Sequence, residues 1–167
     1  MIRRSASGLA ALLLAGCASV PPPATVPSVD LARYAGQWHE IESFPSPFQR
    51  GCSATRAVYI PAPDGRIRVQ NFCRRKGRLD SIEGTARVVP GSNNARLKVR
   101  FFWPFEGDYW ILDLDRDYRW AAVGTPDRRF LWILSRTPEL DPVVLGGIRR
   151  RLATQGYDVN RLQPTPH

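Results

Sequence analysis

Apolar and polar residues alternate with a period of two through most of the chain between residues 37 and 135. This alternation is typical of strands that bury one face and expose the other. Turn-forming residues interrupt it at 64–65, 90–94, 116–117 and 126–127. The sequence therefore predicts eight strands, at 37–44, 53–60, 66–74, 81–89, 95–102, 108–115, 118–124 and 129–135.

Eight antiparallel strands joined by short hairpins in chain order can close into a barrel wide enough for one small ligand. After the last strand, Asp141 and Pro142 are suited to the N-cap and first residue of a helix, and Gly156 to its end. An apolar stripe at helical spacing lies between them and consists of Val144, Leu145, Ile148 and Leu152. We therefore expect an all-β fold, an eight-stranded up-and-down antiparallel β-barrel with one C-terminal α-helix packed on the barrel.

The alternation also indicates which side chains face inward. Three lines of residues share a strand face: Leu97, Val99, Phe101 and Trp103; Tyr118, Trp120 and Ala122; Phe130, Trp132 and Leu134. Most would be wall in any barrel, but aromatic residues near an open end could contact a bound chain. The predicted lining residues are Tyr59, Phe101, Trp103, Tyr109, Trp120 and Trp132. Strand 53–60 is ambiguous, because Arg56 and Tyr59 fall on opposite faces among apolar neighbours, and a β-bulge would reconcile its two faces.

Five successive bulky or rigid residues at 101–105 cannot all face inward on one alternating strand. Some of them must lie in a loop or on the surface, where apolar exposure marks a membrane, ligand-entry or partner site. A turn packed under the C-terminal helix is an equally good interpretation.

The N-terminus resembles a bacterial lipoprotein signal. Arg3 and Arg4 precede an apolar run of about ten residues, too short for a bilayer that needs about 20. The run ends at Cys17 in a sequence like a lipobox, so we expect residues 1–16 to be removed and Cys17 to carry acyl chains, palmitate among them. Residues 17–28 then form a Pro-rich tether. No Asp follows Cys17, which favours the periplasmic face of the outer membrane over the inner membrane.

The two remaining cysteines suit an oxidising compartment. If Ile60 paired with Gly65 in the hairpin between the second and third strands, Cys52 and Cys73 would lie opposite one another. The sequence therefore predicts a Cys52–Cys73 disulfide. A metal site is poorly supported, because the only histidines are His39 and His167.

Several motifs together resemble the lipocalin family over residues 29–162. Gly36 and Trp38 form G-x-W at the first strand, Asp108 and Tyr109 form D-Y at the sixth, and Arg136 follows the last. Residues 47–52 and 114–118 are similar to those of bacterial outer-membrane lipocalins, close relatives of apolipoprotein D. The resemblance implies that Trp38 closes one barrel end under Arg136, as structural residues. Relatives usually carry an aromatic residue at the position of His39.

Length and composition allow one domain. The 167 residues, 43% of them apolar, can form a sizeable core, which we expect at 29–163 with a flexible tail at 164–167. The formal charge is +9, and +7 without residues 1–16, which favours anionic partners. Nucleic acid is a usual partner of such a charge, but a lipobox argues against it.

The leading hypothesis is a non-catalytic binder of fatty acids or lysophospholipids, serving lipid storage, transport and envelope maintenance without a cofactor. Arg56, Tyr59 and Tyr109 are the candidates for contact with a lipid head group. An enzyme is disfavoured, because His39 faces away from Glu40 and Glu42. The alternative is an envelope protein-interaction module with a filled barrel. A homodimer is compatible with either.

Overall fold

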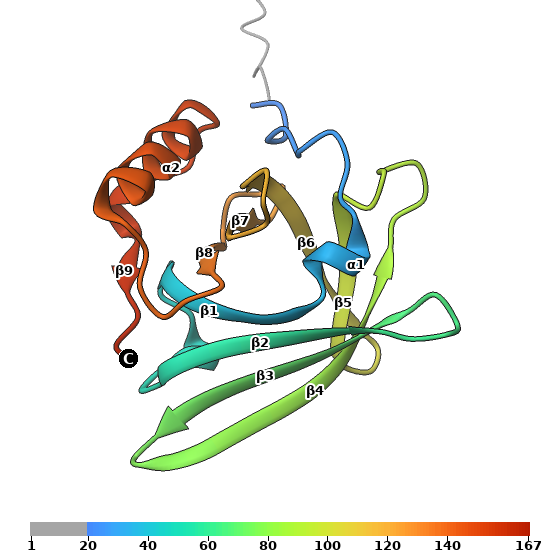
Figure 1. Cartoon of the computed structure of the whole chain (residues 1–167), viewed down its shortest axis with the longest axis horizontal. Helices are drawn as coiled ribbons and strands as arrows, with labels where there is room; N and C mark the ends of the chain where they lie inside the picture. Colours follow the sequence, from blue (N-terminus) through green and yellow to red (C-terminus); the bar gives the residue numbers. More distant parts are fainter. Residues whose placement is uncertain (1–19) are drawn as a thin grey trace, which may run out of the picture.

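Eight antiparallel strands pair in chain order and close into a barrel through pairing of the first strand with both the second and the eighth (Figure 1). The computed structural model describes residues 20–167, so the predicted signal peptide and Cys17 lie outside the described residues. The strands are β1 Gly36–Ser43, β2 Ser53–Pro61, β3 Ile67–Arg75, β4 Arg78–Val88, β5 Arg96–Phe102, β6 Phe105–Leu114, β7 Trp120–Gly124 and β8 Leu131–Ser135. The predicted barrel is confirmed. Each strand begins and ends within three residues of the predicted position.

The order of the strands gives the barrel two different ends. The short helix α1, Leu31–Tyr34, precedes β1, and the connections at 62–66, 89–95 and 115–119 lie at the same end as this helix. We call this the closed end. The connections at 44–52, 76–77, 103–104 and 125–130 lie at the opposite end, which we call the open end. The first of them contains the short 3-10 helix η1, Pro47–Gln49.

The register of the β2–β3 hairpin differs from the prediction. Ile60 pairs with Arg68 and not with Gly65, because residues 62–66 form a longer turn than expected. The predicted irregularity in β2 is present as a register shift between Ser53 and Arg56. Ser53 pairs with Arg74. Cys52 and Cys73, which precede these two residues, therefore lie diagonally across the strand pair. Cys52 and Cys73 are disulfide-bonded with their Cα atoms 5.4 Å apart, as predicted.

Two apolar clusters lie on the two faces of the barrel wall. The inner cluster lies on the inner face of the barrel wall and includes Trp38, Leu97 and Ile111. The outer cluster joins the wall to the helix α2, Pro142–Thr154, through Ile148 and Leu152. Asp141 caps this helix by accepting the backbone N–H groups of residues 143 and 144. The predicted helix is thus confirmed.

One predicted inward face is wrong. Ala121 and Val123 of β7 lie in the inner cluster, whereas Ala122 lies in the outer cluster with Trp120 packed against it. Tyr118 packs against the inner cluster but has a positive φ of 59° in the turn before the strand. The period-two alternation is therefore interrupted at this turn. As a result, Tyr118 packs on the inner face of the barrel wall and Trp120 on the outer face.

Both ends of the described chain are held against the barrel. Val26, in the predicted Pro-rich tether, donates its N–H to the carbonyl of Ile111. After the 3-10 helix η2, Val159–Arg161, the short strand β9, Gln163–Pro164, pairs with β1. Thr165, in the predicted flexible tail, donates its N–H to the carbonyl of Ile41. Within residues 20–167, no helix is both long and apolar enough to cross a bilayer.

Candidate functional site

Arg136 and Trp38 seal the closed end, as the resemblance implied. The Arg136 guanidinium carbon lies 3.8 Å from the centre of the Trp38 ring, and Trp38 is fully buried. The guanidinium also donates to the carbonyls of Gln37 at 2.8 Å and Arg33 at 2.7 Å. Gly36 has a φ of +92°, a conformation that favours glycine. These residues close this end of the barrel.

Three tyrosine hydroxyls form a polar floor above this seal. The Tyr34 and Tyr109 hydroxyls are 2.7 Å apart, and Tyr59 donates to Tyr109 at 2.8 Å. Burial is the main cause that raises the pKa of Tyr59 to about 12, and burial also raises the pKa of Tyr34 and Tyr109. The floor is therefore neutral at physiological pH. Asp108, the other half of the D-Y motif, forms an ion pair with Lys98 at 2.7 Å.

The wall of the barrel is apolar and contains four of the six predicted lining residues. Tyr59 belongs to the inner cluster, and Phe101, Tyr109 and Trp132 pack against it. The Phe101 ring lies so close to Gly84 that a Cβ there would come within 2.6 Å of it. Because Gly84 has no side chain, the Phe101 ring can pack against its backbone.

Two predicted lining residues lie elsewhere. Trp120 is on the outer face, where Arg151 of α2 lies 5.4 Å from its ring centre. Trp103 is 82% exposed, because Phe102 pairs with Phe105 and leaves Trp103 in the turn between them. Arg56 also points away from the interior, over the ring of Phe72 at 4.7 Å. It is not placed to bind a head group inside the barrel.

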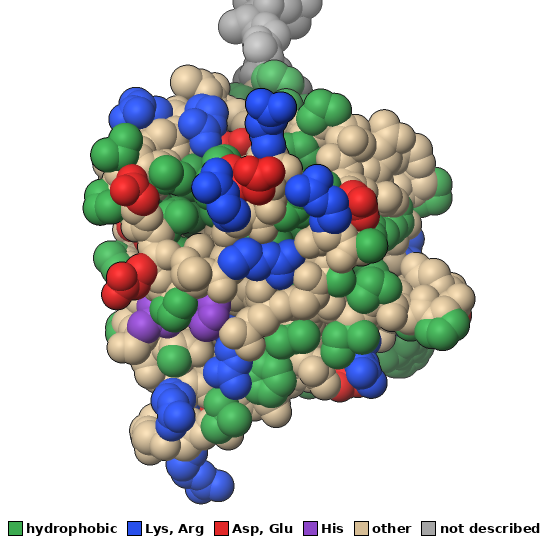
Figure 2. Space-filling view, in the orientation of Figure 1, with side chains coloured by type: hydrophobic (Ala, Val, Ile, Leu, Met, Phe, Trp, Pro, Cys, Tyr) green, Lys and Arg blue, Asp and Glu red, His purple; other side chains and the backbone are tan. Residues whose placement is uncertain are grey.

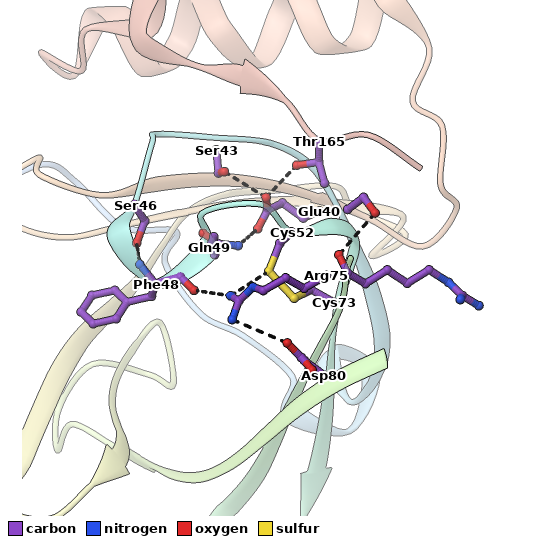
Figure 3. Close-up of a disulfide and its surroundings, with 12 residues drawn as sticks. Glu40, Ser43, Ser46, Phe48, Gln49, Cys52, Cys73, Arg75, Asp80 and Thr165 are labelled. Carbon is purple, nitrogen blue, oxygen red and sulfur yellow. Dashed lines mark hydrogen bonds and ion pairs between the residues drawn. A yellow bond between two sulfur atoms is a disulfide. The ribbon is translucent and has the colours of Figure 1, made fainter. Parts of the chain in front are cut away.

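The open end holds a hollow of about 500 Å³ between the β1–β2 connection and the C-terminal segment. Its lining includes a buried carboxylate, Glu40, which is 5% exposed. This carboxylate accepts hydrogen bonds from Ser43 at 2.9 Å, Thr165 at 2.6 Å and the Gln49 side-chain amide. Figure 3 shows these side chains converging on Glu40 from three separate segments. The mouth is therefore polar, although the wall below it is apolar.

The mouth and the interior meet at Gln49. Its side-chain oxygen accepts a hydrogen bond from the Trp132 indole at 3.3 Å, and Trp132 packs against the inner cluster. Sequence reasoning did not identify Glu40 and Gln49 as mouth residues. The period-two spacing of Glu40 from Trp38 was the available signal for the inward face, but nothing local to Gln49 indicated its partner.

The connection that carries Gln49 is fixed to the end of β3. Arg75 donates to the carbonyl of Phe48 at 3.1 Å and to the sulfur of Cys52 at 3.4 Å, and it lies 3.6 Å from Asp80 (Figure 3). The disulfide joins the same two segments. The mouth is thus held by covalent and polar contacts.

The arrangement offers little for catalysis. Glu40 shares the inner face with Trp38, whereas His39 points outward and accepts a hydrogen bond from the Gln37 amide at 3.0 Å. Glu42 faces α2, where it pairs with Arg149 at 2.8 Å. Within residues 20–167, no three His, Cys, Asp or Glu side chains are grouped so that they could hold a metal ion. The geometry is that of a barrel with a sealed floor, an apolar wall and a polar mouth.

Known proteins share this architecture and sequence. A family model described as a lipocalin-like domain matches residues 29–167. The chain is 39% identical over 161 residues to the outer membrane lipoprotein Blc of Escherichia coli (strain K12). The matched residues cover 93% of this chain and 91% of that protein. It is 41% identical over 150 residues to temperature-induced lipocalin-1 of Arabidopsis thaliana, covering 84% and 81%. The solved structure of insecticyanin from the tobacco hornworm matches with a TM-score of 0.71 and 22% identity over 90% of this chain and 86% of that one, a likeness of fold alone.

Proposed function

Because this chain belongs to the lipocalin family, we propose that it binds a small amphipathic lipid, a fatty acid or a lysophospholipid, inside its barrel. The observation that carries the proposal is the polarity gradient along the barrel axis. An apolar wall lies between the Trp38 seal and a polar hollow at the open end. An acyl chain would lie against the wall, and its head group would stay at the open end near Gln49, whose side chain joins the mouth to the interior.

The proposed location is the periplasmic face of the outer membrane. The lipobox-like sequence at Cys17 supports an acyl anchor, and the E. coli relative is named an outer membrane lipoprotein. Such an anchor would keep the protein beside its source of lipid, in storage or transport that maintains the envelope. The names of the E. coli and Arabidopsis relatives carry no enzymatic activity, which supports a non-catalytic role.

Native mass spectrometry of residues 19–167, purified from periplasm and followed by organic extraction, tests the proposal. We expect adducts of fatty-acid or lysophospholipid mass that a competing lipid displaces, with quenching of tryptophan fluorescence. Val99→Trp would place a large ring beside the inner cluster and should abolish the adducts. Ala153→Trp, on the exposed surface of α2, is the matched control and should retain them.

A clean mass for the wild-type domain, with no quenching by either lipid class, would contradict lipid carriage. Such a result would favour an interaction module with a filled barrel, because apolar side chains are exposed around the β5–β6 turn. Near-ultraviolet circular dichroism of each variant checks that loss of adducts does not come from unfolding.

A further inference from the structure

The open end carries most of the exposed large apolar side chains of the described chain. Seven such side chains are strongly exposed within residues 20–167, and five of them belong to the open-end connections or the strand ends beside them. These five, which we call the apolar rim, are Phe48 (78% exposed), Leu79 (55%), Phe102 (66%), Trp103 (82%) and Phe105 (77%). Side chains of this size gathered at one end of a soluble domain indicate a surface that is covered in use.

The same end is basic. Arg74, Lys76 and Arg78 are exposed at the β3–β4 turn, and Arg50 is exposed in the β1–β2 connection beside Phe48. None of these four cations forms an ion pair within residues 20–167, whereas the nearby Asp80 is paired with Arg75. Figure 2 shows Lys and Arg side chains, without an acidic neighbour, on the β3–β4 hairpin that projects from the barrel in Figure 1.

One residue of the rim, Phe48, is held in position before any partner arrives. Ser46 accepts the N–H of Phe48 at 3.3 Å, and Arg75 donates to its carbonyl at 3.1 Å. With both backbone groups bonded, the Phe48 ring projects away from the disulfide into solvent (Figure 3). A partner would therefore meet an ordered aromatic side chain, and binding would need little further ordering.

We propose that the open end docks onto the surface of a bilayer containing anionic phospholipid, so that the mouth of the barrel faces the membrane. Aromatic side chains are favoured in the interfacial layer of a bilayer, and Lys and Arg bind lipid phosphates. Unpaired cations lie beside two exposed apolar residues of the rim, Phe48 and Leu79, and they fit this surface by charge as well as by polarity. The proposal goes beyond lipid carriage, because a barrel without any cargo would dock in the same way.

Vesicle binding by the unacylated chain 19–167, which contains every strand and both apolar clusters, tests the proposal. The vesicles are phosphatidylcholine with and without phosphatidylglycerol, and binding is measured by co-sedimentation. Arg74→Gln/Arg78→Gln should lower partitioning onto the anionic vesicles about five-fold per cation, or roughly 30-fold for both. The matched control Arg33→Gln/Arg116→Gln removes two exposed closed-end cations that form no ion pair within residues 20–167, and it should change partitioning less than about two-fold.

Trp103 reports on the apolar contact. Trp103→Phe should retain binding but lose most of the blue shift of tryptophan emission that the vesicles cause, because Trp103 is 82% exposed and the other four tryptophans are buried or half-buried. Trp103→Ser should weaken binding to both kinds of vesicle, whereas Val143→Ser, on the exposed face of α2, should not.

Three results would overturn docking by the open end. These are equal binding to neutral and anionic vesicles, equal losses for the open-end and closed-end charge variants, and a blue shift that survives Trp103→Phe. Docking would also be overturned if the chain bound neither the neutral nor the anionic vesicles. Lipid adducts in mass spectrometry report on the barrel separately, so failure of docking is distinguishable from failure of carriage.

Discussion

Replacement of Arg136 tests how the closed end is sealed. The guanidinium lies 3.8 Å from the Trp38 ring centre and donates to carbonyls of two separate segments, those of Arg33 before β1 and Gln37 within it. Arg136→Met keeps much of the length of the side chain but removes the charge and every donor. Arg136→Lys keeps the charge but replaces the planar fork with one ammonium group.

The expected magnitude follows from these contacts. Each of the two short hydrogen bonds is worth about 1 kcal/mol, at the low end for charged donors, because Arg136 is partly exposed and water can replace it. The contact with Trp38 adds about 1 kcal/mol. Arg136→Met should therefore cost about 3 kcal/mol, and Arg136→Lys about half of that. At roughly 3 °C per kcal/mol for a domain of this size, Arg136→Met lowers the melting temperature by about 9 °C.

Urea unfolding of residues 19–167, followed by circular dichroism, measures these losses. A double-mutant cycle with Trp38→Leu isolates the ring contact, and we expect a coupling free energy of about 1 kcal/mol. A loss below about 1 kcal/mol for Arg136→Met would refute the assignment of the seal to this side chain. If Arg136→Met lowered the free energy of unfolding by the same amount in the wild type and in Trp38→Leu, the guanidinium–indole contact would be refuted.

Three further predictions concern stability. Cys52→Ala/Cys73→Ala opens a loop with a sequence separation of 21 and should cost about 3 kcal/mol in urea unfolding. Gly124→Ala should cost about 2 kcal/mol by the same measurement, because its Cβ would come within 2.5 Å of the Tyr157 hydroxyl. Burial first, then nearby positive charge, lowers the pKa of His39 below 6.5; its neutral form therefore contributes stability above pH 6.5, and that contribution is lost as pH falls through the lowered pKa.

Each of these has its own control. Reduction with dithiothreitol should destabilise the wild type and leave the double cysteine variant unchanged; a wild type that is equally stable when reduced would contradict the disulfide estimate. Gly107→Ala, where a Cβ meets only one carbonyl at 3.9 Å, should be nearly neutral, and a loss as large as that of Gly124→Ala would contradict the packing argument. His39→Gln should decline less in stability than the wild type between pH of about 8 and about 5, and parallel declines would exclude His39 as the cause.

Local patterns in the sequence determined much of the fold. The alternation gave the number and bounds of the strands, and Asp141 with Pro142 gave the start of α2. The cysteine spacing predicted the correct disulfide even though the expected register, Ile60 with Gly65, was wrong. The pairing survived this error because two strands of one hairpin keep the cysteines close over a range of registers. The G-x-W motif and the late arginine gave the Trp38 seal only through resemblance, since their contact joins residues 98 positions apart.

Only the tertiary structure decided which face of each strand is the inside and which residues meet at the mouth. A period of two distinguishes two faces but does not say which one is covered by a helix, so Trp120 could be assigned to the wrong one. Glu40 and Thr165 meet at 2.6 Å across 125 residues, and no local pattern encodes that contact. The apolar rim likewise exists because barrel closure brings three separate connections to one end. Local propensity acts over a few residues, whereas a barrel mouth is formed by segments that come together only when the sheet closes.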